Sequence, residues 1–212
     1  MKIKTLFVFF IALISSARGQ STATSFRKLS RPEKCWVIAH PFIAKKAWHC
    51  TQRVRAVTDS IEKAGVLADG NGGHLDAFRH AYWMASLVQE ISPRKAMKLG
   101  KAHEKGNYLD WKKGKNEDAG SRADSMSCVM DLQNNESGIA IGKKFRCDTA
   151  SAKTLIREVL DSDANGNLVM LKKDESGNFY TCDGKPIDLT MYDKAWFIPK
   201  CLVKTSEPVK RR

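Results

Sequence analysis

"PFIAKKAWHCTQRVRAVTDSIEKAG", residues 41–65, decides the fold class of this chain. Apolar side chains recur in it at steps of three and four positions: Ile43, Ala47, Cys50, Val54, Val57 and Ile61. This spacing places them on one face of an α-helix, and that face must be buried against other elements. Gly65 suits the end of the helix. The segment therefore predicts a long amphipathic helix in a mainly α protein.

Further helical patterns follow toward the C-terminus. After the turn-forming ADGNGG, residues 68–73, they span 74–91, 93–105, 123–144 and 149–160. Pro93 fits the first turn of a helix, where its missing N–H costs nothing, and Gly106 follows that helix. We therefore expect a multi-helix bundle, long enough to bury a substantial core.

The sequence pattern changes after residue 160. Residues 166–189 hold two short extended runs around the turn-forming DESGN, which is typical of a β-hairpin. Residues 195–203, AWFIPKCLV, add a candidate third strand. The expected organisation is a leader over 20–40, a helical domain over 41–160 that carries the site, and a β appendage with a tail over 161–212.

The first residues are typical of a secretory signal. Lys2 and Lys4 precede an apolar run of ten residues, TLFVFFIALI, which is too short for a stable membrane span. Ala17 and Gly19 are the small residues that a signal peptidase requires. We expect a signal peptide over 1–19 that is cleaved after Gly19, and hence a secreted or periplasmic protein. No later segment is apolar enough to cross a membrane.

The cysteine count fits that compartment. The chain has 6 cysteines, an even number that favours disulfides in an exported protein. The pairing with the shortest loops joins neighbours along the chain, and other pairings stay open. Those neighbours are Cys35 with Cys50, Cys128 with Cys147, and Cys182 with Cys201. A zinc cluster is disfavoured because the sequence has no C-x-x-C pair.

The charge points to an anionic partner. The formal net charge is +13, and loss of Lys2, Lys4 and Arg18 with the signal peptide lowers it to +10. Such a balance favours an anionic substrate or a polyanion, with nucleic acid, acidic lipid and anionic wall polymer as alternatives. No segment is as crowded with Lys and Arg as a nucleic-acid-reading helix. The sequence leaves the oligomeric state open.

Polar side chains gather on three neighbouring helical segments. GGHLDAFRHAYWMA (72–85) carries Asp76 and His80 four residues apart, on one helix face, with Arg79 beside them. KAHEKGNYLDW (101–111) and MDLQNNESG (130–138) carry the other members of the set, which are His103, Glu104, Asp131 and Asn135. Burial without partners would cost a few kcal/mol for each group. We therefore expect these groups to meet one another, a metal or a substrate.

These blocks carry a resemblance. D-A-x-R-H-A-x-W, then H-E, then M-D-L-x-N-N-x-x-G resembles a helical domain of unknown function found in bacterial secreted and polymorphic-toxin-type proteins. The resemblance covers about residues 73–145 and implies a shared site more than a named reaction. A looser similarity links His80, the His103–Glu104 pair and Asp131 to the metal arrangement of HD-type phosphohydrolases, although Glu104 stands where that pattern has aspartate.

The set predicts a hydrolase site between the helices. His80, His103 and Asp131 are the expected ligands of a divalent ion, zinc or manganese, which would activate water and polarise a phosphoester-type or other anionic substrate. Asp76 would orient His80, Arg79 would bind an anionic group and Glu104 would act as general base, with Asn135 beside them. The alternative is a secreted binding module in which the same groups form a structural hydrogen-bond network.

A second metal position is a calcium loop at the end of the helical domain. Asp161, Asp163 and Asn165 stand at the first, third and fifth positions of an EF-hand-like loop, with Gly166 at the sixth. Lys172 occupies the twelfth position, where a glutamate is expected. The alternative is an Asx-rich turn that opens the hairpin.

Overall fold

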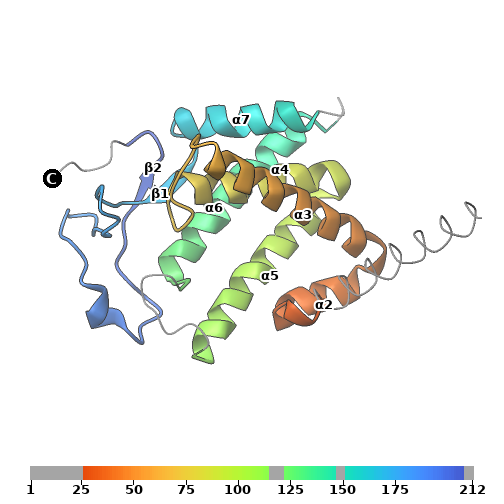
Figure 1. Cartoon of the computed structure of the whole chain (residues 1–212). Coiled ribbons are helices and arrows are strands. Elements are labelled where there is room, and N and C mark those ends of the chain that lie inside the picture. Colours follow the sequence, from red (N-terminus) through yellow and green to blue (C-terminus); the bar gives the residue numbers. More distant parts are fainter. Residues whose placement is uncertain (1–25, 115–121, 147–150, 208–212) are drawn as a thin grey trace, which may run out of the picture.

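A computed structural model describes residues 26–114, 122–146 and 151–207 of the chain. The protein is mainly helical and ends in a small two-stranded sheet beside the helical body (Figure 1). The expected signal peptide over 1–19 and its cleavage site lie outside the described residues. Among the described helices, none has the length and apolarity needed to cross a membrane.

Helix α4 (His74–Glu90) forms the centre of the body, and 11 of its 17 residues are buried. Phe78, Met84 and Leu87 are fully enclosed. A helix that is apolar on most sides can be stable in water only when other helices surround it. The long α3 (Pro41–Lys63) packs on α4 through the apolar face that its sequence predicted. Helices α5 (Pro93–Lys112), α6 (Ser125–Lys144) and α7 (Ala152–Ala164) also pack against it.

Helices α4 and α6 cross at very short range. A Cβ atom on Gly138 would overlap the backbone carbonyl of Ala81, and one on Gly142 would lie 2.8 Å from the carbonyl oxygen of Ala85. Glycine at these two positions therefore allows the helices to approach backbone to backbone. This crossing brings the polar side chains of both helices together.

The expected N-terminal leader contains a helix, α2 (Arg31–Ala39). Ser30 caps it by accepting a hydrogen bond from the backbone N–H of Glu33, while the Glu33 carboxylate accepts one from the N–H of Ser30 (2.8 Å). The indole of Trp36 is buried and donates to the carbonyl of Lys95 on α5 (3.1 Å). Residues 31–39 thus belong to the packed body.

The C-terminal appendage packs against α6. Strands β1 (Val169–Leu171) and β2 (Leu202–Lys204) pair antiparallel, so the expected third strand is the partner of β1. The expected small β appendage is thus confirmed, and isolated antiparallel bridges join Lys173 to Phe179 across the turn at 174–177 and Tyr180 to Pro186. A buried ion pair of Lys200 Nζ with Asp124 Oδ2 (2.6 Å) holds the appendage to the first turn of α6.

One expected disulfide is confirmed, between Cys182 and Cys201 within the appendage. The expected bridge between Cys35 and Cys50 is wrong, because Cys35 is an exposed free thiol on α2 and Cys50 is a buried one on α3. Cys128 is a free buried thiol on α6, and its expected partner Cys147 lies outside the described residues. Cysteine packing in the helical body therefore does not depend on cross-links among the described residues.

Candidate functional site

Three acidic and imidazole side chains meet where α4 crosses α6. His80 Nε2 lies 3.5 Å from Asp76 Oδ1 and 3.4 Å from Asp131 Oδ1. One ligand atom from each residue lies within 4.8 Å of the other two, and all three residues are buried. The prediction that Asp76 and His80 share a face and meet Asp131 from the fourth expected helix agrees with this geometry.

The turn before α4 and the helix itself hold Asp76 in place. Its Oδ2 accepts a hydrogen bond from the backbone N–H of Gly72 (2.7 Å), and its Oδ1 accepts one from the guanidinium of Arg79. Gly72 has a positive φ of 82°, and a Cβ there would overlap the side chain of Leu171. Glycine is therefore required for the turn that presents this N–H.

The carboxylates of the cluster share an environment that favours protonation. Burial raises the pKa of Asp131 well above its usual range, and the nearby charges of Asp76 and Glu104 raise it further. Burial also raises the pKa of Asp76, against the opposing charge of Arg79, and that of Glu104, against His103. Asp131 Oδ1 accepts no hydrogen bond from the described residues. A proton or a cation would relieve the repulsion among these groups.

His80 is held in its neutral form. Burial, together with the positive charges of Arg79 and His103, lowers its pKa well below the usual range. Asn135 on α6 interacts with the His80 side chain and also faces Gly100 of α5, where a Cβ would lie 2.9 Å from Asn135 Nδ2. A neutral imidazole beside two carboxylates is a suitable ligand set for a divalent transition metal.

Glu104 lies on α5, behind this cluster. Its Oε2 accepts a hydrogen bond from Asn107 Nδ2 (2.9 Å), and the Cys128 thiol is a second partner. Glu104 is buried and does not line the cavity described below. The structure thus brings Glu104 close to the metal-ligand candidates without giving it access to a substrate.

His103 does not join the three-residue cluster. It donates from Nδ1 to Glu33 Oε1 on α2 (2.9 Å), and its ring centroid is 6.3 Å from that of His80. The expected ligand set of His80, His103 and Asp131 is therefore replaced by Asp76, His80 and Asp131. Burial alone would lower the pKa of His103, but the hydrogen bond to Glu33 and the charge of Glu104 raise it.

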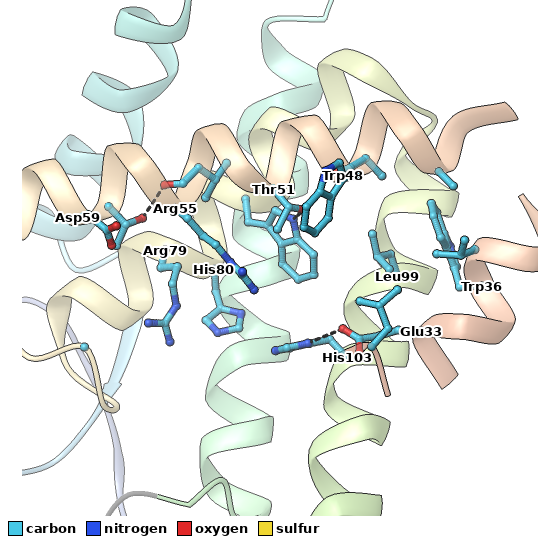
Figure 2. Close-up of a pocket in the computed structure, with 18 of the residues that line it drawn as sticks. Glu33, Trp36, Trp48, Thr51, Arg55, Asp59, Arg79, His80, Leu99 and His103 are labelled. Atoms are coloured by element: carbon cyan, nitrogen blue, oxygen red, sulfur yellow. Dashed lines mark hydrogen bonds and ion pairs between the residues drawn. The ribbon is translucent and has the colours of Figure 1, made fainter. Parts of the chain in front are cut away.

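A cavity of about 510 Å³ lies between α2, α3, α4 and α5. Its walls include Arg79, His80 and His103, and Figure 2 shows these three side chains together with Glu33 along one side of it. Neither Asp76 nor Asp131 lines the cavity. His80 is the member of the cluster that connects the buried carboxylates to the open space.

The expected calcium loop adopts a different geometry. Asp161 and Asp163 are residues of α7, which ends at Ala164, and not of a loop. The carboxylate of Asp163 accepts a hydrogen bond from His74 Nδ1 on α4 (2.8 Å). Asn165 is the C-cap of α7 and is exposed. Because Asp163 faces the helical body, these residues do not converge on one cation position.

One residue in contact with the site, Glu33, is absent from the sequence predictions. Glu33 pairs with His103 and stands in the S-x-x-E capping pattern of Ser30, so the pattern alone would have placed a helix there. Asn134 belongs to the M-D-L-x-N-N-x-x-G pattern, and its side-chain amide bonds both backbone groups of Val169 in β1, at 2.8 and 3.0 Å. Asn134 therefore fastens the sheet to α6 and is structural.

Comparison with known proteins places this arrangement in a family. The profile of a domain of unknown function (DUF6973) matches residues 34–167, which is more than half of the chain. The chain belongs to the DUF6973 family. No curated protein and no solved structure matches it.

The DUF6973 match contains every residue of the cluster and the helices that carry them. It begins within α2, in the segment expected to be a leader, and ends before β1. The C-terminal sheet and its disulfide therefore lie outside the family region, although they hold the helix that supplies Asp131.

Proposed function

We propose that the protein is an exported hydrolase in which Asp76, His80 and Asp131 hold a divalent ion, zinc or manganese, and which acts on a phosphoester-type or other anionic substrate. The observation that carries the proposal is the cluster of three buried ligand atoms within 4.8 Å of one another. A carboxylate oxygen that accepts no hydrogen bond fits an ion there, because an unpartnered buried charge is costly. When bound, such an ion would supply a hydroxide near neutral pH.

The cavity side chains have distinct tasks in this proposal. Arg79 is 40% exposed, so it can bind an anionic oxygen while it still contacts Asp76. His103, whose pKa is raised, holds a proton that it can donate to a leaving oxygen. Glu104 is buried behind the cluster, where its carboxylate adds negative charge that favours a bound cation. It has no access to the cavity and therefore does not serve as the general base.

Metal titration tests the proposal. We expect one Mn²⁺ or Zn²⁺ to bind per chain in calorimetry, and Tm to rise by roughly 5–11 °C at a hundredfold excess over Kd, since this corresponds to about 2.7 kcal/mol. His80→Ala should abolish both effects. His49→Ala, at an exposed position on α3, is the matched control.

Turnover is measured next, on soluble phosphodiesters and phosphomonoesters with and without chelator. Activity that is lost with chelator and in His80→Ala supports the proposal. A protein that binds no ion and shows no chelator-sensitive turnover contradicts it.

A second candidate is a secreted binding module without catalysis. Two observations favour it. Both carboxylate oxygens of Asp76 already accept hydrogen bonds, from Gly72 and Arg79, and Asn134 holds the sheet to α6. In that case Asp76, His80 and Asp131 stabilise the crossing of α4 and α6, and His80→Ala lowers Tm equally with and without metal. The two functions are therefore separated by the metal dependence of the His80→Ala effect.

A further inference from the structure

The end of the cavity away from Arg79 is strongly apolar (Figure 2). The indole rings of Trp36 and Trp48 line it from α2 and α3, together with Leu99. Trp83 of α4 also lines the cavity and adjoins the imidazoles, with its ring centroid 5.7 Å from that of His103 and 6.5 Å from that of His80. Figure 2 shows Trp36, Trp48 and Leu99 on the side of the cavity away from Arg79. Trp83 donates its indole N–H to Thr51 Oγ1 (2.9 Å), which fixes the ring at the cavity wall.

The polar groups that adjoin the candidate site lie toward the other end, where Arg55 and Asp59 of α3 also line the cavity (Figure 2). Arg79 and His80 of α4 and His103 of α5 lie there, and the Glu33 charge is balanced by its hydrogen bond with His103. The cavity is thus amphipathic along its length, and its volume of about 510 Å³ lies within the usual range of small-molecule sites. A small polar phosphoester would leave the indole-lined part filled with water.

We propose that the substrate is an anionic amphiphile: a phosphate head group at Arg79, His80 and His103, and an aliphatic chain along Trp36, Trp48 and Trp83. The position of the head group rests on the proposed function, whereas the position of the aliphatic chain depends only on the shape and lining of the cavity. Each methylene removed from water should strengthen binding, until the apolar part is full.

The test is a series of alkyl phosphates at concentrations below micelle formation, with inorganic phosphate and butyl, hexyl, octyl and decyl phosphate as probes. Binding is followed by the fluorescence of tryptophan, because three of the 5 tryptophans line the cavity. We expect affinity to rise about fourfold for each methylene, which corresponds to about 0.8 kcal/mol. Equal affinities from inorganic phosphate to decyl phosphate would overturn the proposal.

Two variants and a neutral probe sharpen the result. Ala44→Phe places a ring in the cavity, so affinity should stop rising at a shorter chain; Ala56→Phe, at an exposed position on the same helix, should leave the series unchanged. Octyl glucoside, with the chain but no charge, should bind at least tenfold more weakly than octyl phosphate. Equal binding of the two would overturn the anionic part.

Failure of this inference is distinguishable from failure of the proposed function. The series is repeated with chelator and in Asp131→Asn. If no ion binds but the aliphatic chain does, the affinity for alkyl phosphates still rises with chain length, and neither chelator nor Asp131→Asn alters that affinity. If the ion is present but the chain does not bind, metal-dependent turnover of a short soluble phosphoester remains while the series is flat.

Discussion

Gly138→Ala should separate the two helices that build the site. In an exposed helix the change would stabilise by about 1 kcal/mol, because alanine is the better helix former. Here the new methyl would overlap the carbonyl oxygen of Ala81, and a backbone atom cannot rotate away as a side chain can. Overpacking costs about 1–3 kcal/mol, and the overlap with rigid backbone places this case at the upper end.

The net loss is about 2 kcal/mol, which corresponds to a Tm lower by roughly 4–8 °C in a chain of this size. Thermal unfolding followed by circular dichroism measures it. Gly142→Ala, whose Cβ would lie 2.8 Å from the Ala85 carbonyl, should lose less. Ala140→Gly, at an exposed position of α6, gives the intrinsic glycine effect on the same helix. If Gly138→Ala raised Tm by as much as Ala140→Gly lowers it, the close crossing would be refuted.

Three further changes test other contacts. Burial raises the pKa of Glu33, but its hydrogen bond with His103 and that residue's charge lower the pKa to about 2, so the stability it contributes is present above pH about 4.5 and lost toward pH 2. Glu33→Gln should therefore lower Tm at pH 6 and converge with the parent protein near pH 2; a constant difference would contradict this. Lys200→Ala should cost about 3–5 kcal/mol by leaving the Asp124 carboxylate buried without its ammonium, as chemical denaturation would show. Asp131→Asn should raise Tm in chelator, because it removes a carboxylate whose pKa is raised by burial and by neighbouring acids, and should abolish any metal-induced rise; a lower Tm in chelator would count against that repulsion.

The helical body was predictable because each helix has a local sequence pattern that indicates it. The apolar period of residues 41–65 predicted a helix that the structure has at Pro41–Lys63. Helix α5 continues past Gly106 to Lys112, beyond the expected end at 105, because Gly106 packs against the Ser30 side chain and does not terminate the helix. A glycine within a helical pattern ends the helix only when its small size is not needed for close packing against another segment.

The candidate site was predictable where its residues lie on one helix or on two helices that cross directly. Asp76 and His80 share a face by spacing alone, and Asp131 faces them from α6. The partner of His103 could not be predicted in this way, because Glu33 lies 70 residues earlier, in the segment expected to be a leader. Pairings between distant segments depend on packing, which no local pattern encodes.

The family boundary and the physical boundary of this protein do not coincide. The matched region ends at residue 167, but the ammonium that neutralises the start of α6 comes from Lys200, and Asn134 is saturated by Val169. An excised 34–167 fragment would retain every ligand candidate yet carry an uncompensated carboxylate and a bare amide on the helix that presents Asp131. The C-terminal module therefore supports the candidate site, and any engineered transplant of that site should include the module or replace those two contacts.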